Sequence, residues 1–155
     1  MHLDEVASVI HETLSAYPAS DDKDLGSVIW LHDTLEDTDT TLEELEREFG
    51  SRVALAVFAM TGYGKTRAER WKSMEKNARM VFHKDYEAFM LAAHAKTADR
   101  IANLRNSFVN RPELYAAYTA HRTDFHLFYA RYTPVELQDA LAAAYDLGNQ
   151  QQQAA

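Results

Sequence analysis

The sequence predicts a single all-α domain, and three observations support this. Apolar residues recur at steps of three and four along most of the chain, which is the spacing of one face of an α-helix. Several segments begin at capping residues and end at glycine or proline. No segment has the alternation of a half-buried strand. The chain has 155 residues, and we expect one domain over 1–148 and a frayed polar tail over 149–155.

The first elements are two helices joined by a loop. Apolar residues from Leu3 onward mark an amphipathic helix that continues to Tyr17, and Pro18 closes it. Residues 19–23 are expected to form the loop. A second, more buried helix then begins near Leu25 and runs into His32-Asp33.

The next two helices are predicted from their caps. Thr41-Leu42-Glu43-Glu44 has the pattern of a capping box, and Gly50 is placed to end that short helix. Ser51 is expected to cap the following helix, over 52–61. That helix is apolar on nearly every face, so we expect it to be buried.

The middle of the chain predicts a turn and two long helices. Gly62-Tyr63-Gly64 forms the turn, and a basic helix follows over about 67–82. The longest helix is expected over 85–107. It is apolar on two sides, which places it at the centre of a bundle, and Asp99 lies in the middle of its alanine-rich side.

The last third predicts further helices. Apolar and aromatic residues from Leu114 to Tyr132 follow in heptad-like order. We interpret the aromatic stripe from Tyr115 to Tyr132 as packing; the alternative is a contact between two copies in a homo-oligomer. Thr133-Pro134 begins the last helix, with the proline at the first helical position, and Gly148 ends it.

Composition excludes several classes of protein. The chain has no cysteine, and therefore no disulfide or thiolate zinc site. Its longest apolar run, over 53–60, is too short to cross a bilayer, and the N-terminus lacks a secretory signal, so we expect a cytoplasmic protein without a membrane partner. The net charge of −8 argues against nucleic-acid binding.

The charges are distributed unevenly along the chain. Residues 33–48 carry eight acids and one base, whereas residues 65–79 carry six bases and two acids. Residues 96–111 carry four bases and one acid. Basic segments and a metal that face one cleft would bind a small anion. The alternative is that each run is a solvated helix face.

The strongest candidate site centres on residues 32–38. Helical spacing pairs His32 with Glu36 and Asp33 with Asp37, and an imidazole beside carboxylates is a start for a divalent-metal site. Further ligands must come from elsewhere, and Asp99 is the best candidate because a carboxylate on a buried face needs compensation. His2 is another. Alternatively, His32 is a packed core histidine, and a cap for the next helix lies at 37–38.

Two blocks of sequence resemble a known family. Residues 28–38, with 41–45 and Phe49-Gly50, are similar to the HD-domain hydrolases of the RelA/SpoT type, which include small alarmone hydrolases. The segment Lys96-Thr97-Ala98-Asp99-Arg100, continued to Arg105, resembles the family's second block. Residues 2–7 and 68–72 are similar to its opening and middle segments. The resemblance covers about the first two thirds of the chain and implies an HD-domain helical bundle.

The resemblance also implies roles for individual residues. His2, His32, Asp33 and Asp99 would hold one divalent ion, manganese in the alarmone hydrolases. Glu36 and Asp37 would position and deprotonate the attacking water, and Asn103 would contact the nucleotide or hold a water. Four basic residues would complement the diphosphate: Lys65, Arg67, Arg70 and Lys72.

The implied reaction removes the 3′-pyrophosphate of (p)ppGpp, giving GDP or GTP. Two alternatives are an HD-type phosphohydrolase for another nucleotide and a non-catalytic nucleotide-binding regulator. Family members carry a further helix before the first metal histidine. The chain begins one residue ahead of His2, so that helix is missing from this sequence. Either the true start lies upstream, or the protein lacks this part of the substrate clamp.

Overall fold

The computed structural model describes residues 2–15 and 22–149, and every regular element in these ranges is helical. The elements are α1 (His2–Leu14), α2 (Lys23–Leu31), α3 (Thr34–Asp37), α4 (Leu42–Phe49), α5 (Ser51–Met60), α6 (Arg67–Lys84), α7 (Tyr86–Asn110), α8 (Pro112–Ala120), α9 (Arg122–Phe128), the 3₁₀ helix η2 (Ala130–Tyr132) and α10 (Val135–Tyr145). The predicted all-α class is confirmed. Pro18, most of the expected loop at 19–23 and residues 150–155 of the expected tail lie outside the described residues.

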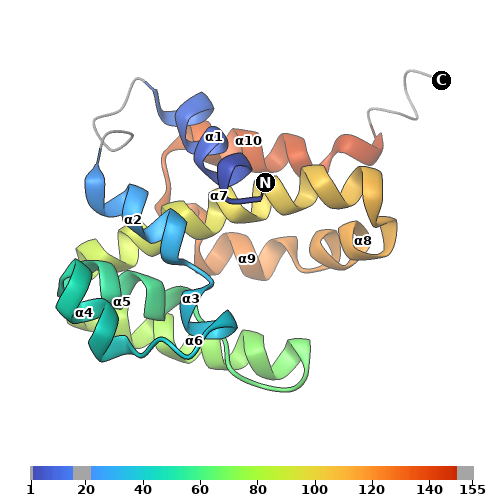
Figure 1. Cartoon of the computed structure of the whole chain (residues 1–155). Helices are drawn as coiled ribbons and strands as arrows, with labels where there is room; N and C mark the ends of the chain where they lie inside the picture. The colour runs from blue at the N-terminus through green and yellow to red at the C-terminus, as the bar shows by residue number, and fades with distance from the viewer. Residues whose placement is uncertain (1, 16–21, 150–155) are drawn as a thin grey trace.

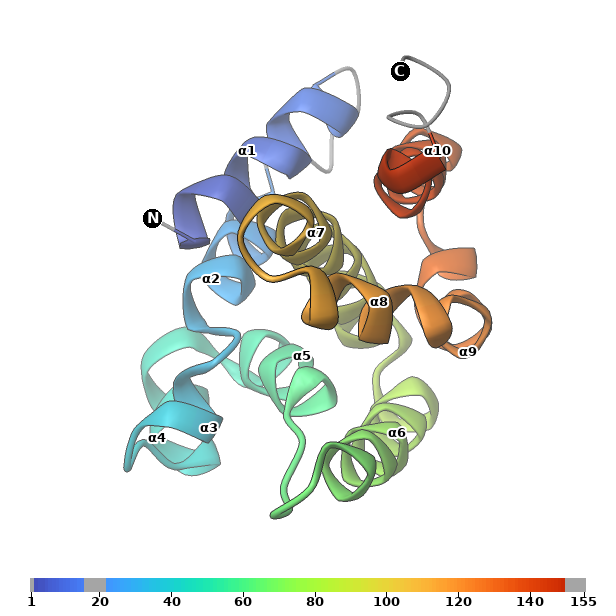
Figure 2. The same ribbon diagram turned by 90° about the vertical axis from the view of Figure 1, so that its right-hand side faces the viewer.

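Helix α7 is the centre of the bundle. It crosses the middle of the molecule in Figure 1, and in Figure 2, viewed roughly along its axis, α1, α2, α5, α8 and α10 surround it. Its alanines at 92, 95, 98 and 102 are buried, and their small side chains let the neighbouring helices approach closely. Because α7 is covered on most sides, a polar group on its buried face has to find its partners within the protein.

Helix α4 has the end signals that the sequence predicts. The Thr41 hydroxyl accepts from the backbone N–H of Glu44, whose carboxylate accepts from the backbone N–H of Thr41, so the capping box is confirmed. Gly50 follows the helix with a φ of 87°, a conformation that favours glycine. The expected Ser51 cap is wrong by one residue, because Gly50 precedes α5 and Ser51 already belongs to it.

Other predicted boundaries also need correction. Lys23, expected in a loop, begins α2, because the Asp22 carboxylate accepts from the N–H of Asp24 and caps the helix there. Pro134 precedes α10 rather than opening it, and α10 ends at Tyr145. Gly148 lies in a separate helical turn over 147–149, so it does not end α10.

The heptad-like segment after Leu114 is divided into three elements. The backbone leaves helical geometry at His121, between α8 and α9, and again at Tyr129, before η2. With these bends, Phe125 and Tyr129 both reach the core and are fully buried. Packing of these two aromatic residues is therefore confirmed, although the single continuous pattern concealed the bends.

In the described part of the chain, no helix combines the length and the hydrophobicity needed to span a bilayer.

One buried hydrogen bond ties η2 and α9 to the core. The Tyr129 hydroxyl donates to the carbonyl of Ala59 in α5 over 2.9 Å. We expect Tyr129→Phe to lower the free energy of unfolding by about 1–2 kcal/mol, because it leaves the buried carbonyl without this donor. The control is Tyr86→Phe, at a residue that is 51% exposed, which should change stability little. Urea unfolding measures both, and equal losses would contradict the role of this hydrogen bond.

Candidate metal centre

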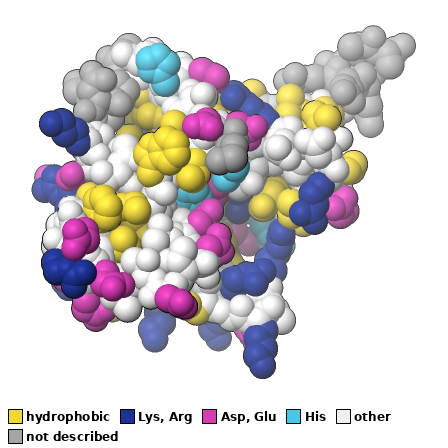
Figure 3. Space-filling view, in the orientation of Figure 1, with side chains coloured by type: hydrophobic (Ala, Val, Ile, Leu, Met, Phe, Trp, Pro, Cys, Tyr) yellow, Lys and Arg dark blue, Asp and Glu magenta, His cyan; other side chains and the backbone are white. Residues whose placement is uncertain are grey.

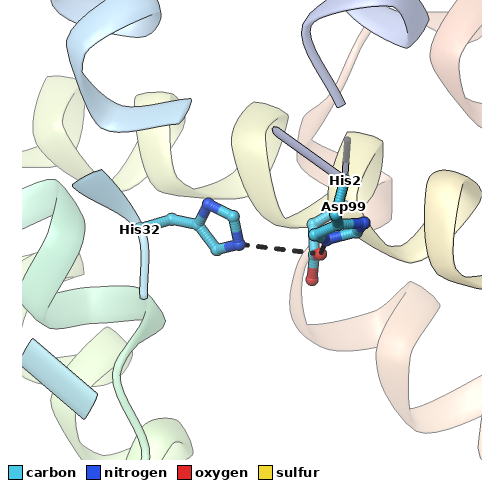
Figure 4. Close-up of side chains that lie close together, drawn as sticks. All are labelled: His2, His32 and Asp99. Atoms are coloured by element: carbon cyan, nitrogen blue, oxygen red, sulfur yellow. Dashed lines mark hydrogen bonds and ion pairs between the residues drawn. The ribbon is translucent and has the colours of Figure 1, made fainter. Parts of the chain in front are cut away.

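Three side chains from distant parts of the sequence meet beside α7. His2 comes from the first turn of α1, His32 follows the last residue of α2, and Asp99 lies in the middle of α7 (Figure 4). Each offers one ligand atom, and these three atoms lie within 4.8 Å of one another. This cluster, His2, His32 and Asp99, was predicted from the sequence, and we call it the His–His–Asp group.

His32 is oriented so that its Nε2 faces this group. Its ring is buried, and its Nδ1 donates to the carbonyl of Ile29 over 2.8 Å. That bond places a proton on Nδ1, so Nε2 is the nitrogen that can bind either a second proton or a cation. Nε2 lies 3.0 Å from an Asp33 oxygen and 3.7 Å from Asp99 Oδ1, yet it forms no hydrogen bond. A buried nitrogen with this pattern matches a metal-binding histidine, whose second nitrogen usually donates to a backbone carbonyl.

Asp99 is the buried carboxylate of the group. Its Oδ1 accepts from His2 Nε2 over 2.9 Å and from Asn103 Nδ2 over 2.8 Å, and its Oδ2 lies 3.5 Å from Lys96 Nζ. Burial alone would raise the pKa of Asp99, but the charge of Lys96 and the hydrogen bond from His2 hold it well below its usual range. The carboxylate is therefore ionised, as a metal ligand must be.

The two imidazoles bind protons more tightly than ordinary histidines in the metal-free protein. The hydrogen bond to Asp99 raises the pKa of His2 above 6.5, although burial opposes it. Burial also lowers the pKa of His32, but the carboxylates of Asp33 and Asp99 outweigh it and raise the pKa. A cation at the centre of the group would take the place of these protons.

Asp33, the fourth predicted ligand, lies at the edge of the His–His–Asp group. It directly precedes α3, and nearly half of its side chain is exposed. Its Oδ2 is 3.0 Å from His32 Nε2 but does not belong to the set of atoms that are mutually close. The alternative interpretation of this segment, a helix cap at 37–38, is wrong, because Thr38 follows α3 and Thr41 caps α4.

A cleft of about 580 Å³ opens beside Asp99. Asn103 and Glu36 line it, together with the cationic side chains of Arg67, Arg70, Lys96 and Arg100. Figure 3 shows histidine and acidic side chains gathered near the centre of one face, with Lys and Arg side chains beside them. The cleft therefore combines a cation-binding end with a basic wall, an arrangement suited to an anionic ligand that is bound together with a metal.

The other predicted site residues are divided between the cleft and the open surface. Glu36 is in α3, and its Oε1 accepts from the backbone N–H of Gly62 over 2.7 Å. Arg70 lines the cleft from α6. Asp37 and Lys72 are exposed and are not among the described residues that line it.

Three participants had no individual role assigned at the sequence level, although two of them belong to the basic segment 96–111. Lys96 and Arg100 lie three residues before and one residue after Asp99 on α7, so helical spacing alone could have indicated Lys96 as its partner. The N–H of Gly62 gave no signal, because every residue except proline carries a backbone N–H.

Two relatives are named for the same reaction. The chain is 38% identical over 85 residues to the guanosine-3′,5′-bis(diphosphate) 3′-pyrophosphohydrolase of Aquifex aeolicus (strain VF5), covering 54% of this chain and 12% of that protein. It is 40% identical over 88 residues to the guanosine-3′,5′-bis(diphosphate) 3′-pyrophosphohydrolase MESH1 of Danio rerio, covering 56% of this chain and 45% of that protein. The matched part is thus less than half the length of either relative. No family model and no solved structure matches the chain.

Binding of a divalent ion should weaken as the pH falls. Protons compete for the imidazole nitrogens of His2 and His32, and the raised pKa values mean that this competition begins above the ordinary histidine value of 6.5. Calorimetric titration with Mn²⁺ above and below that pH should show a falling affinity, with protons released on binding. Asp99→Asn should abolish binding.

The matched control for this titration is His11→Gln. His11 is exposed on the same helix as His2, and its replacement should leave Mn²⁺ affinity unchanged. An affinity that does not depend on pH, or that survives Asp99→Asn, would contradict a metal site at these residues.

Proposed function

We propose that the protein is a metal-dependent hydrolase of guanosine 3′,5′-bis(diphosphate) that removes the 3′-pyrophosphate. The observation that carries the proposal is the His–His–Asp group at one end of a cleft with a basic wall. The two relatives support the choice of reaction, since both are named as guanosine-3′,5′-bis(diphosphate) 3′-pyrophosphohydrolases. The resemblance to HD-domain hydrolases agrees with it.

The metal would be held by His2, His32 and Asp99, with Asp33 as a fourth ligand beside His32. The Nε2 of His32 and the ionised carboxylate of Asp99 fit a divalent first-row ion, and we propose manganese. Such an ion, when bound, lowers the pKa of a water and neutralises charge on a phosphoryl group.

Glu36 would act as the general base. Its carboxylate lines the cleft and is exposed enough to reach a water there, while the Gly62 N–H fixes one of its oxygens. The water oxygen bonds to the phosphorus that carries the 3′-oxygen, and Glu36 takes the proton of the water. The bond from phosphorus to the 3′-oxygen then breaks and pyrophosphate is released. The 3′-oxygen leaves as an alkoxide and takes a proton from solvent water to become the 3′-hydroxyl, and Glu36 returns its own proton to solvent. Asp37, next along α3, would help to position the water.

The basic wall of the cleft would bind the phosphates. Lys96 and the guanidinium groups of Arg67, Arg70 and Arg100 supply the charge that four phosphate groups require. Two of these guanidinium groups lie over the ring of Tyr118, that of Arg67 at 5.2 Å and that of Arg100 at 4.6 Å from its centroid. Asn103, besides its bond to Asp99, lines the cleft and would contact the nucleotide. Lys72 would approach the phosphates only from outside the cleft.

The proposed partner is therefore a small guanosine nucleotide rather than a nucleic acid or a membrane, and the proposed location is the cytoplasm. A homo-oligomer that uses the exposed part of the aromatic stripe remains part of the hypothesis.

Substitution of the proposed base tests the reaction. With Mn²⁺, the wild-type protein should convert guanosine 3′,5′-bis(diphosphate) to GDP and pyrophosphate, and chelation should stop it. Glu36→Gln should lower kcat by about 100- to 1,000-fold while Mn²⁺ affinity stays the same, because the amide cannot accept the proton. The control is Glu46→Gln, at an exposed glutamate of α4. A metal-loaded protein that cleaves only other nucleotides would contradict the proposal.

Two basic residues of α6 form a matched pair for substrate binding. Arg70 lines the cleft, whereas Lys72 is exposed outside it. Arg70→Ala should raise KM by about 10-fold, the loss expected for one charge-assisted hydrogen bond, and Lys72→Ala should raise it less. Steady-state kinetics separates the two. A larger effect at Lys72 would mean that the substrate lies across the outer surface of α6.

A further inference from the structure

We propose that Asn77 is a positioning residue that sets the orientation of Glu36 through a single peptide group, the one that joins Thr61 to Gly62. The catalytic part of this inference rests on the proposed function. The contacts themselves are independent of it.

The peptide group is bound at both of its polar ends. The Asn77 Nδ2 donates to the carbonyl oxygen of Thr61 over 3.0 Å, and the N–H of Gly62 donates to Glu36 Oε1 over 2.7 Å. This oxygen and this N–H belong to the same planar unit and point in opposite directions. A donor fixed at one end therefore determines where the other end points. It also polarises the unit, which strengthens the bond to the carboxylate.

The Asn77 side chain is buried, and its contacts point to this one role. Its side chain comes from the buried side of α6 and is only 7% exposed, and its one hydrogen bond among the described contacts goes to Thr61. A buried amide is costly unless it is bonded, so an apolar residue would be expected there if only packing mattered. Because a carbonyl oxygen can only accept, the partner has to be a donor, which the amide nitrogen supplies.

The neighbouring backbone fixes where this peptide group lies, while its two polar ends are bonded only by Asn77 and Glu36 among the described contacts. Thr61 is fully buried, and its N–H and hydroxyl donate to the carbonyls of Phe58 and Val57 at the end of α5. Gly62 is close to α6, since a Cβ at this position would lie 2.5 Å from the carbonyl oxygen of Arg70. Figure 2 shows this connection leaving α5 and descending between α3 and α6. Glycine is therefore required at 62, and the N–H is aimed by contacts with two helices.

The test uses an almost isosteric change. In Asn77→Asp, the carboxylate cannot donate to the Thr61 carbonyl and repels it, so the peptide group should rotate and release Glu36. We expect kcat to fall by about 10- to 100-fold, the size of a small misplacement of a catalytic group, with KM and Mn²⁺ affinity unchanged. The matched control is Gln138→Glu, because the Gln138 Nε2 donates to the carbonyl of Thr133 over 2.8 Å in α10. That variant loses the same kind of bond away from the cleft and should keep its kcat.

A spectroscopic measurement reports the peptide group without reference to activity. The Thr61-Gly62 pair is the only threonine followed by glycine in the sequence, so ¹³C-carbonyl threonine with ¹⁵N-glycine selects the Gly62 amide. Its proton should resonate at lower field in the wild-type protein than in Glu36→Ala, where the acceptor is lost. Asn77→Asp should move it in the same direction, and Gln138→Glu should not move it.

The outcomes separate this inference from the proposed function. A Gly62 resonance that is the same in wild type and Glu36→Ala would overturn the inference, and this comparison needs no Asn77 variant to fold. So would an equal loss of kcat in Asn77→Asp and Gln138→Glu. If the wild-type protein hydrolyses no guanosine 3′,5′-bis(diphosphate), the proposed function fails, and the resonance alone then decides whether Asn77 orients Glu36.

Discussion

The buried carboxylate of Asp99 is the constraint on which the rest of the site depends. A charge on the central helix of an all-α bundle is tolerated only where cations and donors compensate it, and Asp99 has His2, Asn103 and Lys96. Two of these partners come from α7 itself, at spacings of three and four residues. The third comes from the first turn of α1, ninety-seven residues earlier in the chain. Asp99 therefore fixes where the N-terminal helix meets the bundle, and the alanines around it leave room for that helix to approach.

Charge is separated along the cleft. At one end, the Nε2 atoms of His2 and His32 both face the Asp99 carboxylate, which is an environment for a cation. Along the wall, Lys96 and three arginines of α6 and α7 face the open volume. Lys96 belongs to both ends, because it stabilises the Asp99 carboxylate and lines the cleft. A cation at the His–His–Asp group and a ligand with several negative charges along the basic wall would together occupy both ends of the cleft.

The sequence predicts the parts of this arrangement that depend on local spacing or on a charged residue at a buried position. The capping box at 41–44, the central position of α7 and the exceptional place of Asp99 on its alanine side follow from spacing alone. The meeting of His2 with His32 and Asp99 was expected from the ligand needs of a metal site and from the family resemblance, since helical spacing alone does not join residues from three helices. The bends at His121 and Tyr129 were missed because heptad-like order continues across them. The hydrogen bond to Glu36 was not predicted, because its donor is the backbone N–H of Gly62, twenty-six residues away.

His32 and Glu36 have one structural feature in common, which is a hydrogen bond at the end of a neighbouring helix. A helix leaves backbone groups without intrahelical partners at its ends. The carbonyl of Ile29 is one of these at the end of α2. It accepts from Nδ1 of His32, and Nε2 of the same ring then faces the candidate metal site. The peptide group just past α5 is another, and Asn77 satisfies its carbonyl while its N–H engages Glu36. In both cases, under our proposal, the bond that completes the end of a helix also orients a side chain of the candidate site. The residues at which α2 and α5 end would therefore set the orientation of His32 and Glu36 in the candidate site.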